Sequence, residues 1–356
     1  MAVDGDPALE VLLSPFVDGS LAWPAQGGAL FLQARDGWPL HQQALPGLVC
    51  ATDLKPDADA LQRSGFAVQP GDANADGRRF PLVLVLPPRQ REHARALFAR
   101  AVAATTDGGI VVACASNDEG AKSAQADLAR IAGPLQSRSK RHCRVFWSAP
   151  LHGAVDPALA SQWREADQPR AVAEGRFRSR PGVFAWDRID AASALLASQL
   201  PPDLAGSATD LGAGFGYLSA ELLTRCSAVT SLDLYEADAR ALALARDNLA
   251  AFAGRATLGF HWHDVTAGLV QAYDVIVSNP PFHAQGRADR PDLGRAFLAA
   301  AADALRPGGR LLLVANRHLP YESLLQSRFA RHRTLAQQDG FKVIEAVMAD
   351  SPRAAR

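Results

Sequence analysis

The stretch TDLGAGFGYLSAELL (209–223) decides the fold, because it reads as a strand, a glycine loop and a helix in direct succession. Asp210 ends the predicted strand, and Gly212, Gly214 and Gly216 follow at alternate positions. All four are candidate cofactor-binding residues. Glycine suits such a loop because the backbone turns sharply there and a ligand approaches it closely. The dinucleotide fingerprint places its last glycine one residue later. The spacing G-x-G-x-G is typical instead of methyltransferases, whose cofactor S-adenosylmethionine has no pyrophosphate.

The next segment supplies an acidic partner for this loop. VTSLDLYEADARALALARDNL (229–249) reads as a strand followed by an amphipathic helix. Glu236 ends the strand 20 residues after Gly216, the spacing at which a carboxylate accepts bonds from ribose hydroxyls. Asp233 competes for this role but lies inside the apolar strand pattern, which favours a structural position. Asp264, in FHWHDV after a third strand, is a candidate acceptor for an adenine amine, with a turn or cap role as the alternative.

Strands and helices alternate through the second half of the chain. The predicted strands are 208–211, 229–235, 273–278, 309–315 and 342–348. The predicted helices are 189–199, 216–225, 237–252 and 292–305. This alternation predicts an α/β fold with a doubly wound, mostly parallel sheet.

The first half of the chain repeats part of this plan. PLVLVLPP (81–88) resembles YDVIVSNPP (273–281), and an Ala-rich helix, a Gly-Gly turn and a strand follow in each half. We interpret the similarity as a duplication, although any two α/β units share some of these features. Leu86 takes the place of Asn279, Lys55 falls roughly where Glu236 would lie, and the first half has no G-x-G-x-G. We therefore expect the first half neither to bind the cofactor nor to catalyse the reaction.

The predicted domains are a degenerate methyltransferase-like domain at 1–150, a linker at 151–172 and a catalytic domain at 173–356. The most basic stretches lie around the linker, in SRSKRHCR (137–144) and RAVAEGRFRSRPG (170–182). Basic side chains of this kind are candidate phosphate contacts for RNA. The candidates are Arg138, Lys140, Arg141, Arg176 and Arg178.

The sharpest motif, SNPPFH at the end of the strand YDVIV, suits chemistry on a base amine. Such an amine is a poor nucleophile because its lone pair is delocalised into the ring. Two acceptors, the side-chain oxygen of Asn279 and the carbonyl of Pro280, would hold the amine with its lone pair facing a methyl donor. Pro281 stiffens the backbone around these acceptors. Phe282 offers a flat face on which an extruded or single-stranded base stacks.

This chemistry requires neither a metal nor a strong base, because the leaving group S-adenosylhomocysteine is neutral and positioning does most of the work. His283 is a candidate acceptor for the released proton, with a binding or structural role as the alternative. Asn279 also borders the expected cofactor site. N-P-P-F alone is often a simple turn, but here it follows the glycine loop and the acidic residue in the order that a methyltransferase requires.

Composition limits the other possibilities. The chain has 356 residues with no net charge, 48% hydrophobic and 21% charged residues, which fits a folded protein that contacts RNA only through local patches. Its four cysteines form no C-x-x-C pair and indicate reduced thiols in a cytoplasmic protein. We expect no signal peptide, and no apolar run approaches the ~18 residues that span a membrane.

Together these residues resemble the bacterial ribosomal RNA small-subunit methyltransferase C family, which methylates the N2 amine of a guanosine in 16S rRNA. The segments that carry the resemblance are PGVFAWDRID (181–190), TDLGAGFGYLS (209–219), VSNPPFH (277–283), LLLVANRHLPY (311–321) and GFKVIEAVM (340–348). The resemblance implies two tandem Rossmann-like methyltransferase domains, of which the degenerate first helps folding and RNA binding. It further implies 16S rRNA or the 30S subunit as partner and leaves the oligomeric state open.

Carried over, the resemblance places the family's Asn-Pro-Pro-Phe on 279–282, its glycine loop on 212–216 and its acidic ribose ligand on Glu236, where relatives often have Asp. The chain departs from the family at 185–188, where Ala-Trp-Asp-Arg replaces the usual Ser-Arg-Asp-Gly. Lys342, in G-F-K-V, is a candidate RNA or substrate contact, with a solvated lysine at a strand end as the alternative.

Three alternatives stay open. A relative of the family acts on 23S rRNA. Other N-P-P methyltransferases modify adenine N6 or a protein glutamine, although they more often have Tyr as the aromatic residue and lack a degenerate twin. A non-catalytic ribosome assembly factor that binds RNA is the third, and the intact motifs of the second half argue against it.

Overall fold

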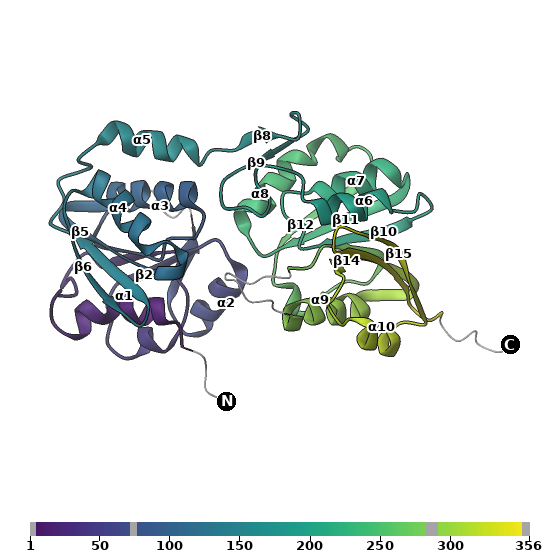
Figure 1. The fold of residues 1–356 in the computed structure, drawn as a ribbon, viewed down its shortest axis with the longest axis horizontal. Coiled ribbons are helices and arrows are strands. Elements are labelled where there is room, and N and C mark those ends of the chain that lie inside the picture. The colour runs from purple at the N-terminus through teal and green to yellow at the C-terminus, as the bar shows by residue number, and fades with distance from the viewer. Residues whose placement is uncertain (1–4, 72–76, 282–290, 351–356) are drawn as a thin grey trace. The chain divides into compact units, whose positions relative to one another are not determined.

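The computed structural model describes residues 5–71, 77–281 and 291–350, and the chain divides into two compact units (Figure 1). Unit 1 comprises Met1–Gln168 with Arg180–Gly182, and unit 2 comprises Pro169–Ser179 with Val183–Arg356. Each unit contains one seven-stranded sheet with helices on both faces. This architecture confirms the predicted α/β fold with two methyltransferase-like domains.

The sheet of unit 1 has the strand order β3-β2-β1-β4-β5-β7-β6. Its strands are β1 (Ala29–Leu32), β2 (Leu48–Thr52), β3 (Ala67–Pro70), β4 (Phe80–Val85), β5 (Thr105–Ser116), β6 (Leu135–Lys140) and β7 (Cys143–Ser148). Its helices are α1 (Pro7–Val17), α2 (Lys55–Arg63), α3 (Arg91–Ala103), α4 (Ala121–Ala132) and α5 (Pro157–Ala166), with 3-10 turns η1 (Trp38–His41) and η2 (Asn117–Glu119). One core cluster joins α3, α4 and α5 to the sheet, and another joins α1 and α2 to it.

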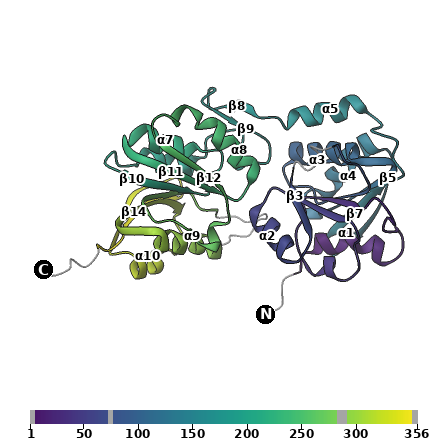
Figure 2. The same cartoon turned by 180° about the vertical axis from the view of Figure 1, so that it is seen from behind.

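The sheet of unit 2 has the same order, β12-β11-β10-β13-β14-β16-β15. Its strands are β10 (Ala205–Leu211), β11 (Ala228–Glu236), β12 (Thr257–Trp262), β13 (Tyr273–Ser278), β14 (Leu305–Asn316), β15 (Arg331–Gln338) and β16 (Phe341–Val347), and β8 (Arg170–Val172) pairs with β9 (Phe177–Ser179) as a separate hairpin. Its helices are α6 (Ala191–Ser198), α7 (Tyr217–Arg225), α8 (Ala239–Asn248), α9 (Pro291–Ala304) and α10 (Glu322–Arg328), with 3-10 turns η3 (Ala250–Phe252) and η4 (Val265–Ala267). Helices α6, α7 and α8 cover one face of this sheet, and α9 and α10 cover the other. Figure 2 shows α7 and α8 on one side of the sheet and α9 and α10 on the other.

The repeat that the sequence predicts is present in full. In both sheets the first five strands in spatial order are parallel. The sixth strand (β7 or β16) pairs antiparallel with the fifth, and the edge strand (β6 or β15) pairs antiparallel with the sixth. Val85 pairs with Leu32 in unit 1, and Ser278 pairs with Leu211 in unit 2. The following residue, Leu86, therefore stands where Asn279 stands, as predicted.

The predicted counterpart of Glu236 needs a correction. Leu32 pairs with Ala51 as Leu211 pairs with Tyr235, so Thr52 takes the place of Glu236. Lys55, which was expected near that place, instead opens α2, as Ala239 opens α8. Unit 1 thus loses the carboxylate at this position rather than reversing its charge.

The loop after β1 also lacks the first two of the three glycines, and Gly37 stands in the place of the third, Gly216. Gln33 and Arg35 take the places of Gly212 and Gly214, because the Ala34 N–H donates to the Ala51 carbonyl as the Ala213 N–H donates to that of Tyr235. The Arg35 guanidinium pairs with the Asp6 carboxylate at 3.1 Å. The loop of unit 1 therefore carries side chains at the two positions where unit 2 has only glycine backbone.

The predicted linker at 151–172 also needs a correction. Residues 157–166 form α5, whose Ala160 and Trp163 side chains are 5% and 4% exposed in the core of unit 1. The prolines of this segment suggested a connector, but Pro157 begins the helix, where its missing N–H costs nothing. The edge strands β6 and β15 were not predicted, because their sequences, LQSRSK and RHRTLAQQ, are polar and largely exposed.

Candidate active site

The glycine loop and the Asn-Pro-Pro segment meet at the carboxyl ends of neighbouring strands. The chain leaves β10 towards β11 and returns to β13 on the other side, so a topological switch point lies between β10 and β13. The Ser278 hydroxyl donates to the Leu211 carbonyl at 2.8 Å and ties the two strand ends together. A Cβ atom on Gly212 would lie 4.0 Å from the Asn279 carbonyl oxygen. Open α/β sheets bind their ligands at such a point.

The loop has the backbone that the sequence predicts. Gly212, Gly214 and Gly216 have φ angles of 73°, 56° and 90°, in the left-handed region that favours glycine. A Cβ atom on Gly216 would approach Ala245 of α8 to 3.3 Å, so this glycine permits close helix packing. A Cβ atom on Gly214 would meet no atom within 4 Å, so the loop opens there onto free space. Bare backbone beside free space fits a cofactor that lies against the loop.

Glu236 faces this loop from the end of β11. Its Oε2 atom accepts the Gly214 N–H at 2.7 Å, and its Oε1 atom accepts the Asp238 N–H at 2.8 Å. Burial raises the pKa of this carboxyl, and the backbone N–H groups oppose that rise. A carboxylate offers about four acceptor positions, so these N–H groups, with a further one from Ala237, leave capacity for hydroxyl groups of the ligand. These contacts suit the predicted ribose contact.

Asp210 does not line the site as expected. Its side chain is fully buried, with 0% exposure, and its Oδ2 atom accepts the Ser219 hydroxyl at 2.7 Å. Its Oδ1 atom is buried without a hydrogen-bond partner among the described residues. The side chain therefore anchors the first turn of α7 beneath the loop, rather than presenting an oxygen at the surface. Burial raises the pKa of this carboxyl to about 7.

Asp210 should make stability fall as the pH rises. Its ordinary pKa of 3.8 becomes about 7 in the folded state, so between these values the folded chain holds a proton that the unfolded chain releases. The free energy of unfolding then decreases from pH 4 to pH 7, by up to about 4 kcal/mol on an order-of-magnitude scale. In denaturant titrations at pH 5 and pH 8, Asp210→Asn should gain stability relative to the parent chain at the higher pH. An equal difference at both pH values would contradict this assignment.

Asp264 has the cap role that was its alternative. It precedes η4, and its Oδ1 atom accepts the Thr266 N–H at 2.9 Å and the Thr266 hydroxyl at 2.7 Å. Both bonds fall on Oδ1, and the adenine contact stays a prediction for the other oxygen.

Asn279 is held from α6. Its amide nitrogen donates to Asp190 Oδ2 at 3.0 Å and to Ser193 Oγ at 2.8 Å. Because both amide hydrogens are used, the side-chain oxygen is the acceptor left for a substrate. Pro280 is buried and Pro281 half-buried, and Phe282 and His283 lie outside the described residues. The roles of Asp190 and Ser193 were not predicted from the sequence, since Asp-x-x-Ser before a helix indicates only a helix cap.

Lys342 does not face solvent as an RNA contact would. Its side chain is 6% exposed, and its Nζ atom donates to the Leu319 carbonyl at 2.9 Å and pairs with Glu322 Oε1 at 2.6 Å. The salt bridge holds the pKa of Glu322 below its usual range. Lys342 therefore fastens the segment between β14 and α10, and the proposed contact with RNA is corrected to this structural role.

The basic candidates lie on two hairpins, and most of them are ion-paired at the surface. Arg138, Lys140 and Arg141 lie on or beside the β6–β7 turn, and Arg176 and Arg178 on the β8–β9 hairpin. The pairs are Arg138–Asp18 at 2.6 Å, Arg141–Glu10 at 2.7 Å and Arg176–Glu221 at 2.7 Å. The Arg178 guanidinium donates to the Pro169 carbonyl at 3.3 Å. Lys140 is exposed and has no ion pair within the described parts of the chain.

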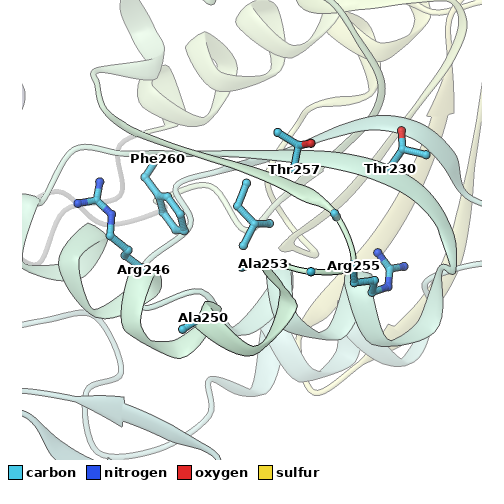
Figure 3. Close-up of a pocket in the computed structure, with 10 residues that line it drawn as sticks. Thr230, Arg246, Ala250, Ala253, Arg255, Thr257 and Phe260 are labelled. Carbon is cyan, nitrogen blue, oxygen red and sulfur yellow. The ribbon is translucent and has the colours of Figure 1, made fainter.

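A hollow of about 700 Å³ in unit 2 lies apart from this site (Figure 3). Thr230 and Thr257 line it at the amino ends of β11 and β12, whereas the glycine loop follows a carboxyl end. The Arg246 guanidinium lies 5.1 Å from the centre of the Phe260 ring in its wall. The hollow therefore lies towards the opposite end of these strands from the switch point.

None of the helices in the described parts of the chain has the length and apolar character that a membrane span needs.

The sheet order and this site define the protein as an S-adenosylmethionine-dependent methyltransferase, and a family model described as the methyltransferase small domain matches residues 174–345. Ribosomal RNA small subunit methyltransferase C from Pseudomonas aeruginosa (strain UCBPP-PA14) is 32% identical over 352 residues, covering 96% of this chain and 99% of the relative. Its namesake from Serratia proteamaculans (strain 568) is 30% identical over 271 residues, covering 76% and 75%. The chain belongs to the ribosomal RNA small subunit methyltransferase C family.

A solved structure agrees with this membership. The 16S rRNA N2 methyltransferase of T. thermophilus, in complex with AdoMet (S-adenosylmethionine) and guanosine, is 25% identical to the chain. The two structures superpose with a TM-score of 0.79 over 96% of this chain and 92% of the other. The match covers both units, so the degenerate first unit is part of the shared architecture.

Proposed function

We propose that this protein transfers the methyl group of S-adenosylmethionine to the N2 amine of a guanosine in 16S ribosomal RNA. The observation that carries the proposal is the fixed carboxamide of Asn279 beside the glycine loop. The relative from T. thermophilus is described as acting on guanosine 1207 of 16S rRNA, and the corresponding guanosine is the expected target. We place the reaction in the cytoplasm, where ribosomal subunits are assembled.

Each part of the site has a task in this reaction. When bound, S-adenosylmethionine supplies an electrophilic methyl group on its sulfonium. The bare loop at Gly214 and the free acceptor positions of Glu236 would hold the cofactor. The side-chain oxygen of Asn279 and the carbonyl of Pro280 would accept the two hydrogens of the guanine amine. Because these acceptors are already in position, they need no reorganisation during the reaction. This positioning accounts for most of the rate acceleration of such a site.

The target is tested by mapping modified nucleosides. Mass spectrometry of 16S and 23S rRNA from cells with and without the gene should show one N2-methylguanosine that disappears from 16S rRNA. In vitro, tritium from labelled cofactor should enter 16S rRNA, offered free or in 30S subunits, but not 23S rRNA or a release factor. Label in 23S rRNA or in the release factor would instead favour the corresponding alternative, and no label in any acceptor would refute the proposal.

The basic hairpins are proposed as phosphate contacts, with unit 1 contributing to RNA binding. The side chains of Arg138, Arg141 and Arg176 are 49%, 59% and 58% exposed. Ion pairs this exposed contribute little energy, so phosphate groups can replace the carboxylates.

The double variant Lys140→Gln/Arg141→Gln should bind RNA less tightly and with a shallower salt dependence. Each lost phosphate contact lowers the slope of log Kd against log salt by roughly 0.7 to 0.9. Fluorescence anisotropy with a labelled 16S rRNA fragment at several salt concentrations measures the slope. The control Lys122→Gln removes an exposed charge from α4. Equal slopes for the double variant and the control would remove these side chains from the RNA-binding surface.

A further inference from the structure

The first turn of α6 holds the carboxamide of Asn279 in one orientation. The Asn279 Nδ2 atom lies 3.0 Å from Asp190 Oδ2 and 2.8 Å from Ser193 Oγ. A carboxylate only accepts hydrogen bonds, so the end of the amide that faces it must be the NH₂ group. The oxygen of Asn279 consequently points away from α6.

This orientation matters because the two ends of a carboxamide have opposite effects on an amine. The oxygen accepts an amine hydrogen, whereas the NH₂ group would present its own hydrogens to those of the substrate. A carboxamide free to turn over would present the wrong end for part of the time. A catalytic acceptor works best when its position is set before the substrate arrives.

Asp190 is itself held in place by the helix. Its Oδ2 atom also accepts the Ser193 N–H at 2.9 Å, which makes Asp190 the N-cap of α6. The helix is anchored by Leu196 and Ala197, which are 0% and 1% exposed in the core cluster of unit 2. The contact thus links a fixed helix to the end of β13.

In unit 1 the aspartate that corresponds to Asp190 caps a helix but has no asparagine to hold. Asp6 caps α1 there, accepting from the Ala8 and Leu9 N–H groups. With Leu86 in the place of Asn279, this carboxylate pairs instead with Arg35 at 3.1 Å. An aspartate cap therefore occurs in both units, and only the unit with the asparagine uses its cap to hold a carboxamide.

We propose that Asp190 and Ser193 are positioning residues, which set the orientation of Asn279 for methyl transfer. The proposal rests on the proposed function, because the fixed oxygen matters only if Asn279 accepts from a substrate amine. It adds two residues outside the glycine loop and the Asn-Pro-Pro segment to the determinants of the rate.

Three variants separate positioning from capping. Asp190→Gly keeps most of the cap, since glycine is itself a well-tolerated N-cap residue, but removes the acceptor. We expect its kcat to fall roughly 10- to 100-fold, as for loss of a hydrogen bond to a charged group, with AdoMet affinity and melting temperature near those of the parent chain. Asp190→Asn keeps an oxygen that the Ser193 N–H fixes, so it should retain kcat within about threefold. Ser193→Ala should lower kcat by up to about tenfold.

The matched control is Asp156→Gly, which changes the N-cap of α5, where Asp156 Oδ1 accepts the Leu159 N–H at 2.9 Å. This control should leave kcat unchanged. An unchanged kcat in Asp190→Gly would overturn the proposal. A parallel loss of kcat, AdoMet affinity and melting temperature in Asp190→Gly would also overturn it, because that pattern marks a purely structural role.

A second measurement needs no methyl acceptor. The side-chain NH₂ signals of Asn279 in ¹⁵N–¹H spectra are assigned by their absence in Asn279→Asp. In the parent chain these hydrogens should exchange slowly with water, and Asp190→Gly should accelerate their exchange. Fast exchange in the parent chain, insensitive to residue 190, would refute the positioning role. If the parent chain labels no RNA, the proposed function fails, and this spectrum still decides the orientation of Asn279.

Discussion

Asn279→Ala should remove nearly all methyl transfer while leaving the affinity for S-adenosylmethionine close to that of the parent chain. The substitution removes the side-chain oxygen that accepts from the base amine, and loss of one preorganised hydrogen-bonding partner of this kind lowers kcat by roughly 10²- to 10³-fold. The contacts of Glu236 with Gly214 and Asp238 do not involve Asn279, so the cofactor side of the site is expected to persist. Transfer assays and calorimetry with the cofactor measure the two effects separately.

Two further variants sharpen this test. Asn117→Ala removes an exposed asparagine of unit 1 and should leave transfer unchanged. Asn279→Leu copies the residue that unit 1 has at this position and should be as inactive as Asn279→Ala. A loss of cofactor affinity in Asn279→Ala as large as that in Glu236→Ala would show that Asn279 acts on the cofactor, contrary to its assigned role.

Glu236→Ala should weaken the binding of S-adenosylmethionine by roughly 100-fold or more, since it removes a carboxylate able to accept bonds from two ribose hydroxyls, each worth about 1.5–3 kcal/mol when the acceptor is charged. The same change releases the Gly214 and Asp238 N–H groups, so the loop also loses its anchor. At saturating cofactor, kcat should change far less than it does in Asn279→Ala. Calorimetric titration gives the affinity.

Asp233→Asn is the matched control, because it changes another acidic side chain of β11. Asp233 accepts from the Tyr273 hydroxyl at 2.7 Å and lies 3.0 Å from His261 Nε2, away from the loop contacts of Glu236. This variant should lose stability but not cofactor affinity. If Asp233→Asn weakened binding as much as Glu236→Ala, the ribose role would have to move to the other carboxylate.

A comparison of the two units shows that a few substitutions in this fold are enough to remove the residues of the site. Both sheets have the same strand order and pairing directions. Leu86 replaces the acceptor, Thr52 replaces the carboxylate, and Arg35 places a side chain where the loop of unit 2 is bare. The strand order depends on the apolar core, whereas the reaction depends on a few residues at the carboxyl ends of the strands.

Some predictions failed for identifiable physical reasons. Local sequence around Lys342 suggested a solvated strand end, but the segment after β14 folds over it and supplies the Leu319 carbonyl and the Glu322 carboxylate. Asp210 was expected to reach the ligand from a strand end, but Ser219 of the following helix turns its side chain inwards. In both cases burial comes from a segment whose path the local pattern does not specify.

Local residue order was sufficient to identify the class of fold, the glycine loop, the acid at the end of β11 and the Asn-Pro-Pro segment, since each depends on backbone geometry or apolar periodicity within a few neighbouring residues. The orientation of the reactive carboxamide became visible only in the folded chain. Asp190 and Asn279 are separated by 89 positions, and packing of α6 against the sheet brings their side chains together. Contacts of that range depend on how whole elements pack, which no local pattern encodes.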